Sequence, residues 1–76
     1  MQEKNLRDFE REISNLEAII DSHLDNKIIE IILKDGREVG GIVDEANDIY
    51  TEFTLVNGNG DYTTVRIEEV EKVYYY

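Results

Sequence analysis

Apolar residues at the start of the chain recur with the period of an α-helix. Within residues 3–25 the spacings alternate between three and four, through Leu6, Phe9, Ile13, Leu16 and Ile20 to His23 or Leu24. This spacing aligns the apolar side chains in one stripe. Asp25-Asn26 is the expected end, because Asn tolerates the left-handed conformation of a C-cap. We therefore predict one amphipathic helix over residues 3–25.

The apolar stripe has two interpretations. Ala18 and Ile19 flank the stripe and widen it, which favours packing on a sheet. We therefore expect the helix to cover one open end of a small β-barrel. The alternative is a coiled-coil seam with a partner helix, although the pattern lasts only about three heptads. His23 falls in the last turn, where the helix dipole favours its charged form.

From residue 27 the period changes to two, the period of β-strands. The alternation predicts strands over residues 27–34, 37–45, 49–56, 62–67 and 73–76. In the second and fourth strands the inward positions would be Val39, Gly41, Val43, Thr63, Val65 and Ile67. In the first strand one face carries Ile29, Ile31 and Leu33, and in the third one face carries Ile49, Thr51, Phe53 and Leu55. A spacing of three between Val70 and Val73 breaks the alternation and predicts one tight helical turn before the last strand.

Glycine-containing turns mark how these strands connect. Asp35-Gly36 is a strong hairpin signal, and residues 57–61 (Asn-Gly-Asn-Gly-Asp) form a second turn. Gly40-Gly41 would let the second strand bend sharply, as small barrels require. The prediction is a mostly β domain over residues 1–76, with one N-terminal α-helix. Residues 27–76 would form a five-stranded, strongly bent antiparallel barrel of the SH3-like type.

The charge of the chain narrows the choice of partner. Acids outnumber bases 18 to 8, which gives a net charge of −10. Nucleic-acid binders usually have the opposite balance, because phosphate contacts dominate their affinity. An acidic surface can serve solubility alone. The functional interpretation is a protein partner with a basic surface, such as a protein that handles nucleic acid.

Little in the sequence indicates catalysis. The chain has no cysteine and one histidine, and its serines, Ser14 and Ser22, both fall in the predicted helix. We find no phosphate-binding loop, nucleophile elbow or metalloprotease motif. We expect neither an enzyme nor a bound metal or cofactor. No apolar run approaches the ~18–20 residues of a membrane span, and the first residues lack a signal-peptide core. We expect a soluble, cytoplasmic protein.

Several segments resemble the Sm-like family of small β-barrels. The matching segments are Leu33–Arg37, Gly41–Val43, and Val65–Ile67 continuing to Val70 and Val73. The resemblance implies an N-terminal helix, five bent strands, and rings joined between the fourth and fifth strands of neighbouring copies. The RNA-binding members carry an Arg-Gly or Lys-His in the last motif, where this chain has Arg66-Ile67-Glu68-Glu69. In acidity and layout the chain is more similar to the Rof-type inhibitors, which bind the transcription terminator Rho and block its RNA site.

The residues expected to carry binding follow from this interpretation. Charge would come from the acids of the loops and strands, and two tyrosines would act as anchors: Asp44, Glu45, Asp48, Glu52, Glu68, Glu69 and Glu71, with Tyr50 and Tyr62. Tyr74, Tyr75 and Tyr76 would form an edge for pairing with another chain, with Tyr75 packed inward beside Val73. One alternative is an oligomeric RNA binder whose rim gathers Asn47, Arg66 and Lys72. Another is a structural module that associates through its helix.

Overall fold

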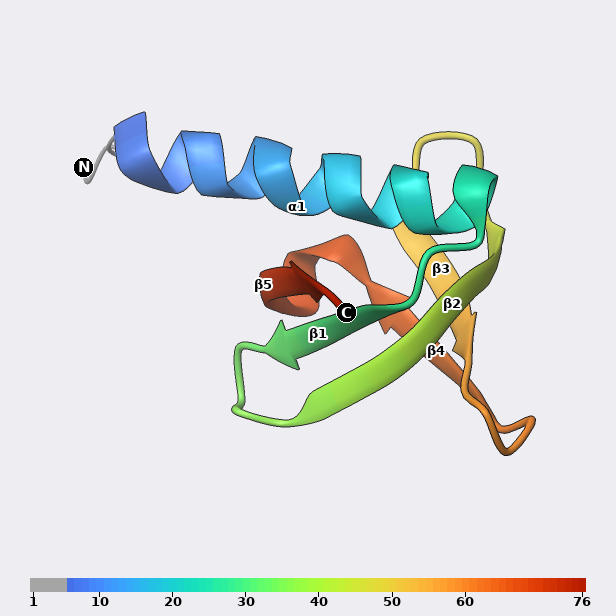
Figure 1. Ribbon diagram of the computed structural model, residues 1–76. Helices are drawn as coiled ribbons and strands as arrows, with labels where there is room; N and C mark the ends of the chain where they lie inside the picture. The colour runs from blue at the N-terminus through green and yellow to red at the C-terminus, as the bar shows by residue number, and fades with distance from the viewer. Residues whose placement is uncertain (1–5) are drawn as a thin grey trace.

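One helix lies across a five-stranded antiparallel sheet in the computed structural model (Figure 1). The structure describes residues 6–76, and side chains from Glu12 onward. The elements are α1 (Leu6–Asp25), β1 (Ile29–Leu33), β2 (Glu38–Ala46), β3 (Glu52–Val56), β4 (Tyr62–Arg66), η1 (Ile67–Glu69) and β5 (Val70–Tyr75). The predicted first residues of the helix, 3–5, lie outside the described residues. The helix ends as predicted, with Asn26 at a positive φ of 56°.

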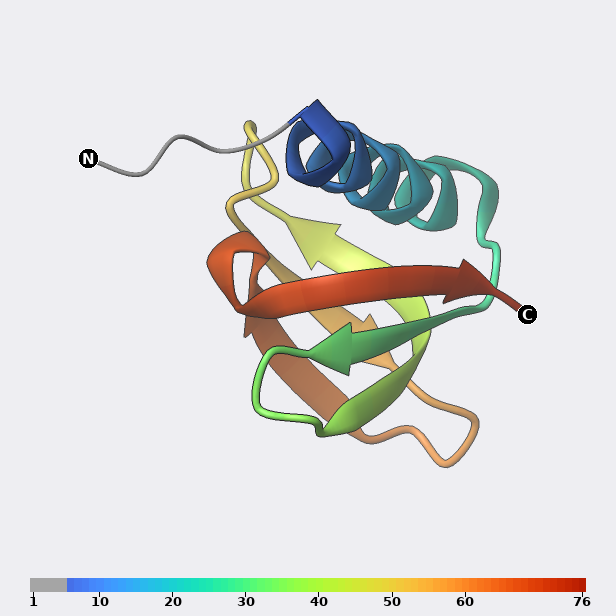
Figure 2. The same cartoon turned by 90° about the vertical axis from the view of Figure 1, so that its left-hand side faces the viewer.

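The strand order is β4-β3-β2-β1-β5, so β4 and β5 are the two edges. The mostly β architecture with one helix is as predicted, but the sheet is not closed, so the small barrel expected from the sequence is not confirmed. Between these edges the chain makes a 3₁₀ turn, η1, which confirms a helical turn between the last two strands. The spacing of Val70 and Val73 that predicted it lies within β5, at a register shift against β1. Seen along the helix, β5 and β1 cross in front of β2, β3 and β4 (Figure 2).

Strand β2 bends at the second of its paired glycines. Its first half pairs with β1 through Gly41, opposite Ile29, and its second half pairs with β3 from Ile42 onward. Gly41 has a φ of 148°, and a Cβ built there would lie 2.3 Å from the carbonyl oxygen of Val56. Only glycine permits this approach, so the expected role of this residue in the bend is confirmed.

The core is built mainly from the inward positions of the strands. The buried cluster consists of Ile19, Ile29, Ile31, Leu33, Val43, Phe53, Leu55, Val65 and Val70. Each of the first four strands thus buries residues from one of the two faces that the alternation of period two separates. Thr63, predicted to face inward, is exposed, and so are Ile49 and Thr51, which share a predicted face with the buried Phe53 and Leu55.

The helix does not use the predicted stripe to cover the sheet. Its buried residues are instead Asn15, Ala18, Ile19 and Ser22. Ile13 is 43% exposed and Leu24 is 68% exposed, while Leu16 and Ile20 are half-buried. At 3.6 residues per turn, the apolar stripe is rotated by about 150° from the buried face. The helix packs on the sheet as expected, but through another face.

Two buried polar side chains attach the helix to backbone groups of the sheet. Asn15 Nδ2 donates to the carbonyl oxygen of Glu71 (3.2 Å), and the amide of Val73 donates to Asn15 Oδ1 (3.0 Å). Ser22 Oγ donates to the carbonyl oxygen of Lys27 (2.6 Å) and accepts from the amide of Val43 (3.0 Å). These bonds satisfy backbone groups that would otherwise be buried without partners.

The third strand begins later than predicted, at Glu52 rather than residue 49. The preceding residues form a turn organised by Asn47, whose Oδ1 accepts from the amides of Thr51 (2.9 Å) and Glu52 (3.2 Å). Ile49 is 72% exposed in this turn. An Asn side chain that bonds to nearby amides competes with strand pairing, which explains the shortened strand. The last strand is longer than predicted and begins at Val70.

Candidate binding surface

The outward surface of β2, β3 and β4 carries one apolar row and one polar row. Cross-strand pairing aligns Ile42, Val56 and Tyr62 in the first row. The same pairing aligns Glu45, Thr54 and Thr64 in the second row, where the Thr54 and Thr64 hydroxyls lie 3.1 Å apart. We call these six residues, together with Asp44 and Glu52, the outer face. Tyr62 is 65% exposed, so it is the most prominent apolar group of this face.

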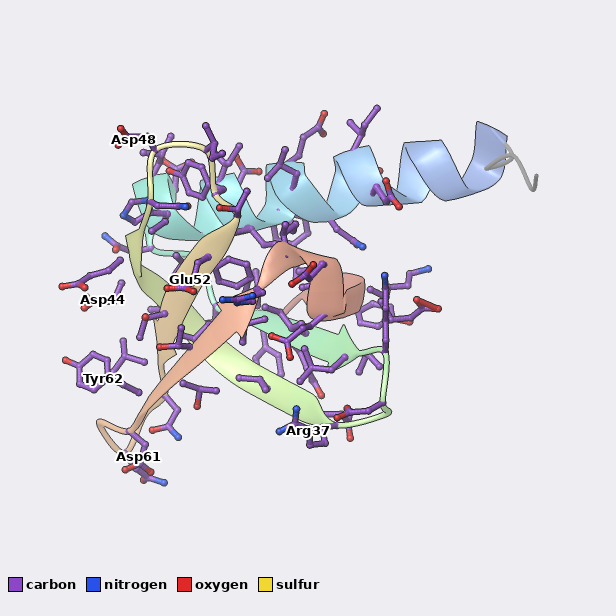
Figure 3. The ribbon with its side chains drawn as sticks, turned by 180° about the vertical axis from the view of Figure 1, so that it is seen from behind. Arg37, Asp44, Asp48, Glu52, Asp61 and Tyr62 are labelled. Atoms are coloured by element: carbon purple, nitrogen blue, oxygen red, sulfur yellow. The ribbon has the colours of Figure 1, made fainter. Side chains whose placement is uncertain are left out.

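Acidic side chains surround this apolar row. Residues 38–65 contain six acids and no Lys or Arg. Asp44 lies where the β2–β3 register shifts, and Asp61 lies in the turn before Tyr62. Figure 3 shows Asp44, Glu52, Asp61 and Tyr62 on the side of the molecule formed by β2, β3 and β4, with Arg37 apart from them. The outer face therefore combines an exposed aromatic anchor with a negative rim.

The remaining predicted acids do not all belong to this face. Asp48 is exposed in the turn between β2 and β3. Glu68 and Glu69 are exposed on η1. Glu71 is half-buried, and its carbonyl accepts the Asn15 bond described above. Of the predicted acids, Asp44, Glu45 and Glu52 thus lie on the same strands as the outer face, with Glu52 at the end of β3 remote from Tyr62.

Tyr50 does not lie beside Tyr62 as a second exposed anchor. It is half-buried, packs against the core cluster, and has a positive φ of 56°. Its hydroxyl lies 2.7 Å from His23 Nδ1, in the last turn of α1. Tyr50 therefore holds the β2–β3 turn against the helix and, being half-buried, offers less surface to a partner than Tyr62 does.

Arg66, the cross-strand partner of Glu52, places one cation on the outer face, where carboxylates pair with it. Arg66 Nε lies 3.6 Å from Glu52 Oε2, and Arg66 Nη1 lies 3.4 Å from Glu68 Oε1. Glu69 Oε1 accepts from the Arg66 amide at 3.0 Å. Arg66 shares a shallow hollow with Asn47, Thr51, Glu52, Ile67 and Glu68. A phosphate that bound Arg66 would therefore compete with the carboxylates of Glu52 and Glu68 for its guanidinium group.

The C-terminal tyrosines lie at the end of the edge strand β5. Tyr74 and Tyr76 are exposed, as predicted. Tyr75 is 53% exposed instead of packed inward, and its hydroxyl donates to Asp21 Oδ2 on the helix (2.7 Å). The hydrogen bond to Asp21 raises the pKa of the Tyr75 phenol, and the negative charge of Asp21 adds to this effect. On the same strand Asn15 already occupies the Val73 amide and the Glu71 carbonyl, so part of this edge is bonded to the helix.

A pair of glutamates lies on the neighbouring strands β1 and β2. Glu30 pairs with Gly40, and Glu38 pairs with Ile32, so the two carboxyl groups are diagonal neighbours across the ladder. A hydrogen bond to Glu38, with a smaller contribution from desolvation and from the Glu38 charge, raises the pKa of Glu30. The sequence analysis did not identify this pair, because the two glutamates lie eight residues apart and become neighbours only through the β1–β2 register.

Among the side chains described, no group of three or more His, Asp or Glu residues is arranged to hold a metal ion. Within the described residues, no helix has the length and apolar character needed to span a bilayer.

Sequence reasoning missed the apolar half of the outer face. Ile42 and Val56 were assigned to strands, but their alignment with Tyr62 depends on the register across three strands. The detectable signal was the absence of Lys and Arg from residues 38–65. Comparison with known proteins adds no assignment: no protein-family model matches the chain, and the search of curated proteins finds no match.

Proposed function

We propose that this chain is a non-enzymatic binding protein that docks on a basic surface of a nucleic-acid-handling protein and regulates or inhibits it. The observation that carries the proposal is the outer face, where Tyr62, Ile42 and Val56 form an apolar row beside acids. Interfaces combine a desolvated aromatic anchor with a polar rim in this way. We further propose that the bent sheet is an open variant of the Sm-like barrel.

The charge distribution supports a protein partner over a nucleic acid. The chain carries a net charge of −10, and two carboxylates, those of Glu52 and Glu68, pair with the guanidinium group of Arg66. A basic surface would be attracted over a range of about one Debye length, which is ~8 Å at physiological salt. The sequence resemblance to Rof-type inhibitors points to the same class of partner. A ligand that occupies a basic surface also excludes nucleic acid from it.

Affinity capture from a lysate tests this proposal when variants accompany the wild type. We expect the wild type to retain a nucleic-acid-binding protein at low salt and to release it as salt rises. Tyr62→Ala and the pair Asp44→Lys with Glu45→Lys should each lower recovery about tenfold or more. Asp25→Lys reverses an exposed acid outside the outer face and is the matched control. Equal recovery by all variants, or no partner at low salt, would refute the proposal.

One observation supports the alternative of an oligomeric RNA binder: Asn47 and Arg66 line the same hollow. Against it, Asn47 already bonds to Thr51 and Glu52, and Arg66 is paired with acids. Lys72, the third expected rim residue, instead lies 5.5 Å from the centre of the Tyr74 ring. Light scattering that gives the mass of a ring, together with a mobility shift of uridine- or adenine-rich RNA, would favour this alternative.

A further inference from the structure

The apolar stripe of helix α1 faces away from the sheet that the helix covers. Asn15, Ala18, Ile19 and Ser22 face the sheet. The stripe, which we define as Ile13, Leu16, Ile20 and Leu24, lies about 150° around the helix. By sequence, Leu6 and Phe9 continue its spacing toward the N-terminus. A regular 3-4 repeat on the side remote from the core is the pattern of a helix that packs against a second helix.

The shape of the molecule leaves room for such a partner. Helix α1 has 20 residues, which corresponds to a length of about 30 Å. Its N-terminal turns extend beyond β1 and β5, whereas the β2–β3 turn rises at its C-terminal turns (Figure 1). Ile13 and Leu24 remain 43% and 68% exposed at the two ends of the stripe, and Leu16 and Ile20 between them are half-buried. A partner helix would therefore contact the exposed part of the stripe, with the β2–β3 turn on one flank.

Acidic residues line both sides of the stripe. On one side the sequence places Glu10, Glu17 and Asp21 in a row at spacings of seven and four. On the other side lies the β2–β3 turn, which the bond between Tyr50 and His23 holds beside the helix and which carries the exposed Asp48. In helix pairs, charges at these flanking positions select the partner. Two acidic flanks require a partner with basic flanks.

The same charges exclude a second copy of this chain as the preferred occupant. Two copies paired in parallel would place the Glu17 of one helix opposite the Glu12 of the other. In an antiparallel pair the acidic rows would face each other. Like charges at such positions destabilise a helix pair, and each copy would add a net charge of −10.

We propose that the stripe of α1 is a docking site for an amphipathic helix of another protein, whose apolar side carries Lys or Arg on both flanks. This site is separate from the outer face, because it lies on the helix and contains none of the residues of β2, β3 or β4. The docking site on the helix can therefore be tested separately from the function proposed for the outer face.

Peptide binding to the full chain tests the proposal. The probe is a synthetic helical peptide of three heptads with Leu at the two core positions and Lys at the flanking positions. One control peptide carries Glu at the flanks, and another has the Lys peptide's composition in scrambled order. We expect the Lys peptide alone to bind, with an affinity that falls as salt rises. Equal binding of the scrambled peptide, or no binding of the Lys peptide, would overturn the proposal.

Variants of the protein separate the stripe from general acidity. The pair Ile13→Gln with Leu24→Gln should weaken binding of the Lys peptide about tenfold or more. Ile28→Gln, which changes another half-exposed Ile outside the helix, is the matched control and should have no effect. Glu17→Lys should weaken the Lys peptide and improve binding of the Glu peptide. An unchanged preference in Glu17→Lys would contradict the proposal, as would a dimer that Ile13→Gln dissociates in sedimentation.

Discussion

Gly41 is the residue at which β2 leaves the β1 ladder and joins the β3 ladder. The bend depends on the absence of a side chain, since a Cβ at this position would lie 2.3 Å from the Val56 carbonyl oxygen. The positive φ of 148° adds backbone strain for any residue with a side chain. The outer face depends on the same bend, because the β2–β3 register begins at the next residue.

We predict that Gly41→Ala lowers the free energy of unfolding by about 2–4 kcal/mol, through strain and the forced separation of β2 from β3. Urea unfolding followed by circular dichroism measures this change. Gly40→Ala is the matched control, since its new methyl group would lie 3.8 Å from the nearest atom, the Ile29 carbonyl oxygen. A similar loss in both variants would show that the bend does not depend on Gly41.

The Glu30–Glu38 pair predicts a dependence of stability on pH. The raised pKa of Glu30 means that the folded state binds this proton more tightly than the unfolded state does. The stability associated with this proton is present at acid pH and is lost as pH rises through the folded-state pKa. Glu38→Gln should therefore raise the melting temperature at about pH 7 and have little effect near pH 3.5.

The control for this prediction is Glu45→Gln, which removes one negative charge from the same strand, β2. Thermal unfolding of both variants and the wild type at the two pH values makes the comparison. If Glu38→Gln and Glu45→Gln behaved alike at both pH values, the effect would come from net charge and the pair would have no specific role.

Helix α1 is attached to the sheet by polar contacts more than by its apolar stripe. Asn15 satisfies an amide and a carbonyl on the edge strand β5, and Ser22 satisfies the amide of Val43. A side chain that bonds to an edge strand also reduces the tendency of that edge to pair with other chains. The element is therefore fixed to the sheet while its apolar side remains accessible.

We predict that Asn15→Ala destabilises the protein by about 1–3 kcal/mol, because it removes the hydrogen bonds that Asn15 makes with the Glu71 carbonyl and the Val73 amide. Hydrogen exchange at the Val73 amide should accelerate, and urea unfolding should shift to lower concentration. Ser14→Ala changes the adjacent, exposed residue of the same helix and serves as the control. Unchanged protection of Val73 in Asn15→Ala would show that this bond does not hold the helix to β5.

At the scale of the whole molecule, the spacing of apolar residues predicted which helices and strands form more accurately than it predicted how they pack together. The helix, the Asp35-Gly36 hairpin, the bend at Gly41 and the turn before β5 are local features, so local sequence signals found them. Closure of the sheet and the packing face of the helix depend on contacts between distant residues. Asn15 and Ser22 are polar, so a search for apolar stripes did not identify them as the packing face.

Only part of the candidate surface was predicted, because it too depends on contacts between residues that are distant in the sequence. Acids and tyrosines are visible in the sequence, but register decides which of them share a face. The register of β2, β3 and β4 places Tyr62 on the same face as Asp44, Glu45 and Glu52. It also leaves Tyr50 bonded to His23, half-buried beside the helix. Charge was thus predictable from composition, whereas the position of the anchor was not.

Competition for a nucleic acid tests the central claim most directly. The anisotropy of a fluorescent nucleic acid bound to the captured partner should fall as wild-type chain is added. Tyr62→Ala should require about tenfold or more protein for the same fall, and Asp25→Lys should match the wild type. Anisotropy that does not fall in the presence of the wild type, or that rises when the chain is added to the nucleic acid alone, would contradict the account.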